Sequence, residues 1–148
     1  MNLPGDTILK MEKQEKALDR NPVVYIVDDD QAVRHSLEWL LGDGEFEVRT
    51  FASAIEFLDT LDPMQPGCLV ADVRMPGMSG LELQHEIKAR GIDLPVIIIT
   101  GHSDRNMALR AMSAGAVNFL EKPLNDEMLI AMIRKALGES PNDGPSAS

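Results

Sequence analysis

The sequence VVYIVDDD, residues 23–30, decides the fold, because an apolar run leads directly into three acidic residues. The run Val23–Val27 is rich in β-branched residues, which is typical of a strand buried on both faces of a parallel sheet. Four more strands are predicted, at residues 46–51, 68–71, 96–99 and 116–120. The first of these four alternates between apolar and polar residues, as a half-exposed strand does.

Helical patterns fill the stretches between these strands. A helix capped by Ser103 or Asp104 is expected to run to residue 114. The other predicted helices cover residues 31–41, 53–61, 79–90 and 124–137, and glycines follow most of them, as expected where helices end. Five strands that alternate with five helices predict an α/β domain with a parallel sheet covered on both faces. Ligands bind such sheets outside the carboxyl ends of the strands.

The predicted core domain covers residues 22–138. Residues 1–21 are interpreted as an N-terminal arm, mobile or forming a short helix. Residues 139–148, with the sequence ESPNDGPSAS, are interpreted as a flexible tail or a truncated linker.

Composition narrows the range of partners and compartments. The chain has 148 residues and a net charge of -10, which disfavours direct nucleic-acid binding, because binding phosphates needs a basic patch. No apolar run is long enough to span a membrane, and the polar N-terminus does not resemble a secretion signal. The single cysteine, Cys68, cannot form an internal disulfide and is expected to be a small buried hydrophobe. We therefore expect a cytoplasmic protein.

Chemically active residue types stand at the ends of the predicted buried strands. Asp28 and Asp29 follow the first strand, Asp72 the third and Thr100 the fourth, while the fifth leads into Lys122. The carboxyl ends of parallel strands meet at one sheet edge, so these side chains should converge. Carboxylates held close together repel one another unless a cation neutralises them. Their hard oxygen ligands suit Mg²⁺, with Mn²⁺ as a possible substitute, and a carboxylate is able to form an aspartyl-phosphate.

Four segments in this order resemble the motifs of bacterial two-component response-regulator receiver domains. They are VYIVDDD (24–30), LVADVRMPGMSG (69–80), IIITGH (97–102) and FLEKP (119–123). The resemblance covers roughly residues 22–138. TGH (100–102), AGA (114–116) and FLEKP are similar to the FixJ-like group of receivers. The resemblance implies one doubly wound (βα)5 flavodoxin-like three-layer sandwich with the parallel sheet order 2-1-3-4-5.

The resemblance also implies a role for each matching residue. Asp72 would be the phosphoacceptor, and Thr100 and Lys122 would contact the phosphoryl group. Mg²⁺ would be held by Asp29, by Asp28 directly or through water, by Asp72 and by the backbone carbonyl of Arg74. Lys122-Pro123 would be a cis peptide, because a cis bond is cheap only before proline.

Two further pairs of residues concern the switch and its timing. Movement of Thr100 toward the phosphate would let Phe119 rotate inward, which would repack the surface of the fourth helix, fifth strand and fifth helix. The side chains of Arg74 and His102 would flank the phosphoryl group and tune its hydrolysis. Asp30 is interpreted as a helix N-cap, and Gly80 is expected to serve loop geometry.

The implied function is a phospho-accepting switch that receives its phosphoryl group from a sensor histidine kinase. It would catalyse only its own phosphorylation and dephosphorylation, so it is not an enzyme with a substrate pool. The output would be transcription, through a domain absent from this chain, or protein contacts made by a stand-alone regulator. The phosphorylated form would pair as a homodimer through the fourth helix, fifth strand and fifth helix, which are expected to present Met107, Arg110, Ala111, Met128 and Met132.

Two rival functions are less well supported by the residues. A Mg²⁺-dependent phosphatase of the haloacid-dehalogenase type needs a D-x-D-x-[TV] segment after the first strand, but Ala32 occupies its last position and the chain lacks a cap domain. A degenerate receiver that only binds partners would usually have lost part of the acid, threonine and lysine set, which is complete here.

Overall fold

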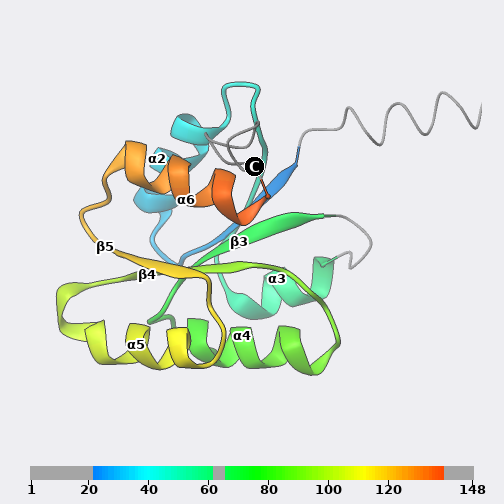
Figure 1. The fold of residues 1–148 in the computed structure, drawn as a ribbon, viewed down its shortest axis with the longest axis vertical. Coiled ribbons are helices and arrows are strands. Elements are labelled where there is room, and N and C mark those ends of the chain that lie inside the picture. Colours follow the sequence, from blue (N-terminus) through cyan, green and yellow to red (C-terminus); the bar gives the residue numbers. More distant parts are fainter. Residues whose placement is uncertain (1–21, 62–65, 139–148) are drawn as a thin grey trace, which may run out of the picture.

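The computed structural model describes residues 22–61 and 66–138, and these form one parallel sheet with helices on both faces (Figure 1). The elements are β1 (Val23–Val27), α2 (Gln31–Leu41), β2 (Glu47–Phe51), α3 (Ala54–Thr60), β3 (Gly67–Asp72), α4 (Gly80–Ala89), β4 (Val96–Thr100), the 3₁₀ turn η1 (His102–Asp104), α5 (Arg105–Ser113), β5 (Asn118–Glu121) and α6 (Asp126–Ala136). The expectations for residues 1–21 and 139–148 lie outside the described residues.

The sheet has the strand order β2-β1-β3-β4-β5, and every neighbouring pair is parallel. This confirms the predicted flavodoxin-like order. The central strands β1, β3 and β4 are buried along their whole length, whereas β2 and β5 at the edges are mostly half-buried. The difference explains why the central strands have continuous apolar runs and β2 has an alternating one.

Two apolar clusters, one on each face of the sheet, form the core. Alternate residues of β1 contribute to opposite clusters, since Val24 and Ile26 pack with α2 and α6 while Val23 and Tyr25 pack with α3, α4 and α5. Figure 1 shows the same division, with α2 and α6 above the sheet and the other three helices below it. From β1 the chain passes to β2 through α2 on one face, and it returns to β3 through α3 on the other face. The topological switch point of the fold therefore lies between the neighbouring strands β1 and β3.

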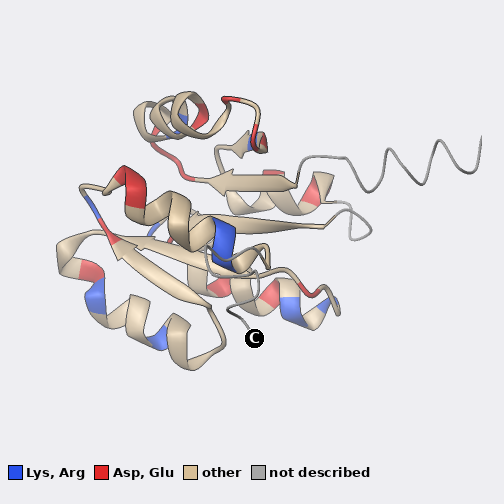
Figure 2. Cartoon of the chain, turned by 45° about the horizontal axis from the view of Figure 1, so that its top comes forward, with Lys and Arg blue, Asp and Glu red and all other residues tan. Residues whose placement is uncertain are grey.

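Local capping fixes where the helices begin. The Asp30 side chain accepts a hydrogen bond from the Ala32 amide, which confirms its predicted N-cap role. Ser79 and Glu82 form a reciprocal capping box at the start of α4. In α6, acidic residues occupy the first turn and basic residues the last, which complements the helix dipole (Figure 2).

Several predicted boundaries were wrong for physical reasons. The fifth strand begins at Asn118, not at 116, because the Ala116 amide donates to Ala111 O at 3.0 Å and so completes the end of α5. Asp104 is the N-cap residue of α5, as one of the two predicted alternatives, and α5 starts after the η1 turn. Its side chain makes no capping hydrogen bond and instead accepts one from Arg74. The last helix begins at Asp126 and is capped by Asn125, so Leu124 lies before it.

The surface expected of the last two helices also needs a correction. Ala111 lies on the buried face of α5 and packs in the core, so it does not belong to an exposed surface. Arg110 and Met128 are exposed, and Met107 and Met132 are half-buried.

Candidate functional site

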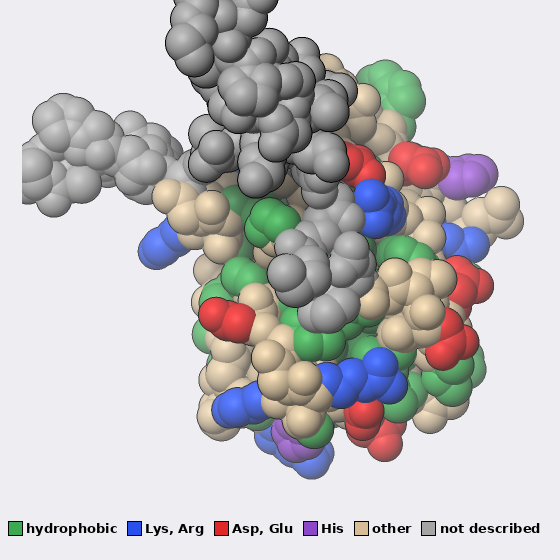
Figure 3. Space-filling model, turned by 90° about the vertical axis from the view of Figure 1, so that its right-hand side faces the viewer, with side chains coloured by type: hydrophobic (Ala, Val, Ile, Leu, Met, Phe, Trp, Pro, Cys, Tyr) green, Lys and Arg blue, Asp and Glu red, His purple; other side chains and the backbone are tan. Residues whose placement is uncertain are grey.

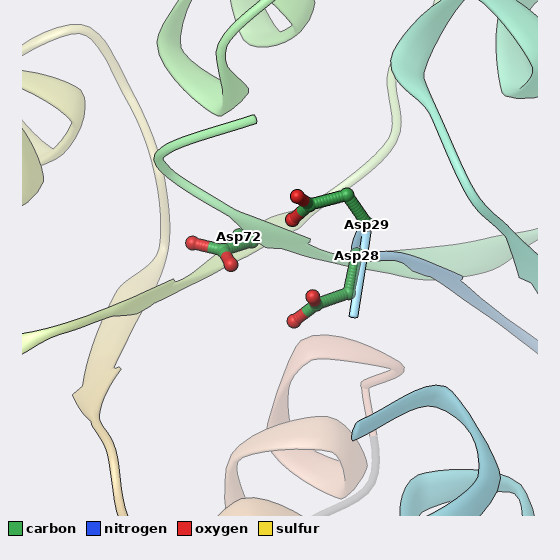
Figure 4. A group of neighbouring side chains, drawn as sticks. All are labelled: Asp28, Asp29 and Asp72. Atoms are coloured by element: carbon green, nitrogen blue, oxygen red, sulfur yellow. The ribbon is translucent and has the colours of Figure 1, made fainter. Parts of the chain in front are cut away.

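Three carboxylates meet where β1 and β3 end. Asp28 directly follows β1, Asp29 comes next, and Asp72 is the last residue of β3. One oxygen from each of these carboxylates lies within 4.8 Å of the others. Figure 4 shows the side chains of Asp28 and Asp29 extending from the end of β1 toward that of Asp72. Asp28 and Asp72 are buried and Asp29 is exposed, so the cluster opens to solvent on one side.

Lys122 places a positive charge against this cluster from the other half of the sheet. It follows β5, and its Nζ donates a hydrogen bond to Asp72 Oδ2 at 3.0 Å. The same Nζ lies 3.4 Å from Asp28 Oδ2. Partial burial opposes the charged ammonium, but the hydrogen bond to Asp72 and the charges of both acids outweigh it and raise the pKa of Lys122. The predicted cis peptide between Lys122 and Pro123 is confirmed.

Asp28 is the electrostatically costly member of the cluster. Burial raises the pKa of its carboxyl, the charge of Asp72 adds to this, and the Asp30 amide partly opposes it. That amide donates to Asp28 Oδ1 at 2.9 Å. The other oxygen, Oδ2, is buried and accepts no hydrogen bond among the described atoms. A buried carboxylate oxygen that has an ion-pair partner at 3.4 Å but accepts no hydrogen bond is one that a coordinated cation would satisfy.

Thr100 ends β4 at the same sheet edge and is fully buried. Its hydroxyl donates to the Gly101 carbonyl at 3.0 Å. On the neighbouring strand, Phe119 pairs in register with Ile98 and is half-buried against the cluster that contains α3, α4 and α5. Thr100 is separated from the start of α5 only by Gly101 and the η1 turn.

The two side chains expected to flank a phosphoryl group have other partners. The Arg74 amide donates to Asp72 Oδ1 at 3.1 Å, but its guanidinium Nε donates to Asp104 Oδ1 at 3.0 Å. His102 is 94% exposed, and its Nδ1 lies 3.4 Å from Glu121. Sequence reasoning missed Asp104 as Arg74's partner. The available signal was an acid four residues after Thr100, on the sheet edge that also holds Arg74.

A groove lined mostly by apolar side chains adjoins the site. It runs away from Lys122 between α2 and the loop after β5, and its walls include Val33, Trp39, Leu40, Pro123 and Leu124. Figure 3 views the molecule from the end of the sheet opposite the site, where basic and acidic side chains are mixed.

Within residues 22–61 and 66–138, no helix has the length and apolar character needed to cross a bilayer.

Comparison with known proteins agrees with this geometry. Residues 24–134 match the sequence model of the family described as response regulator receiver domain. The transcriptional regulatory protein FixJ of Azorhizobium caulinodans is 50% identical over 121 residues, which are 82% of this chain and 57% of that protein. The response regulator protein TodT of Pseudomonas putida is 44% identical over 129 residues, covering 87% of this chain and 57% of that protein. The chain thus spans less than two thirds of these relatives.

Solved structures give the same result. A crystal structure described as FixJ-N has a TM-score of 0.75 and 44% identity, and the match covers 80% of this chain and 95% of that one. Full-length FixJ from B. japonicum has a TM-score of 0.75 and 45% identity, with coverages of 85% and 61%.

An acidic cluster with a lysine at the carboxyl edge of a 2-1-3-4-5 sheet is the arrangement that the sequence motifs of two-component receivers led us to expect. This chain belongs to the response regulator receiver family, and the resemblance to its FixJ-like group is confirmed. The phosphatase alternative is thereby set aside.

Proposed function

We propose that this domain is a signalling switch in which Asp72 accepts a phosphoryl group from a sensor histidine kinase. One observation carries the proposal: three carboxylates gather within 4.8 Å at the sheet edge that also presents Lys122 and Thr100. Phosphoryl transfer needs mainly positioning and charge stabilisation, and this set of groups supplies both. We place the exchange in the cytoplasm, as the single buried cysteine favours.

The donor set fits a hard divalent cation. Asp28, Asp29, Asp72 and the backbone carbonyl of Arg74 would hold Mg²⁺, or Mn²⁺ in its place, and the buried Oδ2 of Asp28 would gain a second partner beside Lys122. When bound, the ion would neutralise negative charge on the incoming phosphoryl oxygens.

The chain's own residues would carry out the transfer. A carboxylate oxygen of Asp72 forms a bond to phosphorus while the bond from phosphorus to the donor histidine nitrogen breaks, and that nitrogen keeps the electron pair. Lys122, now on Asp72 at 3.0 Å, would follow the negative charge onto the phosphoryl oxygens. Hydrolysis by water would later restore Asp72, so the domain acts only on itself.

The readout would follow from Thr100 and Phe119. Thr100 would exchange its bond to the Gly101 carbonyl for one to the phosphoryl group, and Phe119 would move into the space left behind it. The side chains of Arg74 and His102 would tune the rate of hydrolysis.

Transcription is the favoured output. Relatives named as transcriptional regulators extend well beyond the length that this chain matches, and an output domain would lie in that remainder. A stand-alone regulator that acts by protein contacts is the alternative. The coding sequence around the segment for residues 1–148 discriminates between them.

A homodimer of the phosphorylated form would use α5, β5 and α6, with Arg110, Met107, Met128 and Met132 at the contact. Met128 is 49% exposed, so its apolar side chain is accessible for such a contact. Beryllofluoride-loaded protein should sediment as a dimer, and Met128→Glu should return it to the monomer. A loaded wild type that stays monomeric would remove the dimer from the proposed function.

The decisive experiment is incubation with Mg²⁺ and a small acyl-phosphate donor, followed by mass spectrometry of the intact protein. One phosphoryl group should be added to the wild type and none to Asp72→Asn. Asp93→Asn is the matched control, since Asp93 is exposed in the loop before β4, away from the carboxyl ends of the strands. A full adduct retained by Asp72→Asn would contradict the assignment.

A further inference from the structure

One ion pair joins the two loops that border the proposed phosphorylation site. Arg74 lies in the loop after β3 and Asp104 ends the η1 turn after β4, so the pair spans thirty residues of sequence. Nε and Nη2 of Arg74 both donate to Asp104 Oδ1, with Nε at 3.0 Å. We refer to this pair as the Arg74–Asp104 clasp.

The two ends of the clasp differ sharply in exposure. The Asp104 side chain is 9% exposed, whereas that of Arg74 is 70% exposed. The hydrogen bond from Arg74 lowers the pKa of Asp104 against the opposing effect of burial. The other charged side chains at this turn, His102 and Arg105, face Glu121 at 3.4 Å and 3.9 Å instead. Asp104 therefore depends on Arg74 for its positive partner.

Arg74 is also attached to the acid that would be modified. Its backbone amide donates to Asp72 Oδ1 at 3.1 Å, so the root of the side chain is fixed beside Asp72. A phosphoryl group on Asp72 would add a dianion within the reach of a long and exposed side chain. Guanidinium groups bind phosphate oxygens in a bidentate fashion, and such bonds are stronger than those between neutral groups.

We propose, on the basis of the function above, that Arg74 leaves Asp104 for the phosphoryl group when Asp72 is modified, and that this partner exchange releases the turn His102–Asp104 at the start of α5. Arg74 would contact the phosphoryl group directly. Asp104 would be a positioning residue that holds Arg74 in the unmodified state.

The released turn is the one that Thr100 also controls. The Thr100 hydroxyl donates to the Gly101 carbonyl, and the same carbonyl accepts the Asp104 amide at 3.0 Å. Loss of the clasp and withdrawal of Thr100 would thus loosen one turn from two sides. The turn leads directly into α5, which is linked to α4 by a hydrogen bond from the Gln84 side chain to Ala111 O at 3.0 Å.

The test follows the Arg74 Nε–H resonance by NMR in unmodified and in beryllofluoride-loaded protein. Arg74→Lys identifies the resonance, and fluorine NMR verifies that the adduct has formed. In unmodified protein, Asp104→Asn should shift the Arg74 resonance strongly. In loaded protein, wild type and Asp104→Asn should give the same resonance. Glu121→Gln, which removes the other ion pairs of this turn, should leave the resonance in place in both states.

Different results would overturn different parts. A loaded wild type whose Arg74 resonance still responds to Asp104→Asn would refute the exchange, as would an unmodified protein whose resonance does not respond. If no adduct forms, the proposed function fails and the exchange fails with it. Should Asp104→Asn not fold, the carboxyl carbon resonance of Asp104 in the wild type takes its place. It should move on loading, and a stationary signal with the adduct present would contradict the exchange.

Discussion

Asp28 shows at the scale of one residue that the site is built at a cost to the fold. Its carboxylate is buried beside a second acid, and one of its oxygens accepts no hydrogen bond among the described atoms. Burial and the charge of Asp72 raise its pKa, so the ionised form is disfavoured in the folded protein. Groups held for function commonly reduce stability in this way.

Asp28→Asn should therefore stabilise the metal-free domain. The amide keeps the size of the side chain and removes both the burial cost of the charge and its repulsion by Asp72, at the loss of the ion pair with Lys122. Because the raised pKa shows that the unfavourable effects are the larger, we expect a gain of about 1 kcal/mol in the free energy of unfolding. Urea denaturation in the presence of a chelator measures it, with Asp93→Asn as the exposed control. A loss of stability comparable to that of a core mutation would show that the charge of Asp28 supports the fold.

Cys68 gives a prediction about pH. Burial inside β3 raises the pKa of its thiol to about 12 from an ordinary value of 9.0. The folded state holds the thiol proton more tightly than the unfolded state does. The thiol's contribution to the free energy of unfolding is therefore complete below pH 9.0 and is lost as the pH rises toward 12. Native protein should resist iodoacetamide up to about pH 9, whereas urea-unfolded protein should react fully. Rapid labelling of native protein would contradict the burial of this strand.

Gly80 matters at the scale of elements, because it lets α4 begin directly on the backbone of the site. A Cβ atom at this position would lie 2.4 Å from the Asp72 carbonyl oxygen and 3.0 Å from Val73 Cα. The Gly80 amide also donates to Val73 O at 3.0 Å. The helix and Asp72 are thus held together through main-chain contacts rather than through side chains.

Gly80→Ala should both destabilise the domain and disturb the site. The clash is with rigid backbone, so we expect a loss of about 1–3 kcal/mol in unfolding free energy and slower phosphorylation of Asp72 by a small donor. Gly101→Ala is the matched control, because its Cβ would meet only Asp104 Oδ2 at an ordinary 3.7 Å. Equal effects of the two substitutions on urea denaturation would show that the close approach at Gly80 is unimportant.

Elements also show what the sequence was able to predict. β1, β3 and β4 were found because strands buried on both faces have uninterrupted apolar runs, and the converging acids followed from the ends of those strands. The start of β5 was missed because Ala116 and Val117 are as apolar as the strand, while the Ala116 amide belongs to the end of α5. The pairing of Arg74 with Asp104 depends on three-dimensional packing across thirty residues, which local patterns do not contain.

At the scale of the whole molecule, the acidic cluster joins segments that lie far apart in the sequence. The residues of the cluster come from both sides of the sheet's topological switch point. Asp28 and Asp29 follow β1, Asp72 ends β3, and Lys122 follows β5. A cation bound there would touch segments that separate completely on unfolding. Its binding free energy should therefore add to the stability of the entire domain and not to one loop.

Mg²⁺ should accordingly raise the midpoint of cooperative thermal unfolding in a concentration-dependent manner. At a free concentration about 100 times the dissociation constant, the gain in unfolding free energy would be about 2.7 kcal/mol. Asp29→Ala should abolish most of this gain while leaving the metal-free midpoint nearly unchanged, because Asp29 is exposed and its removal opens no cavity in the core. Asp43→Ala, an exposed acid between α2 and β2, should respond to Mg²⁺ like the wild type. If Asp29→Ala also responds fully, the cation is bound elsewhere or only by the general negative charge of the protein, and Asp29 is not a ligand.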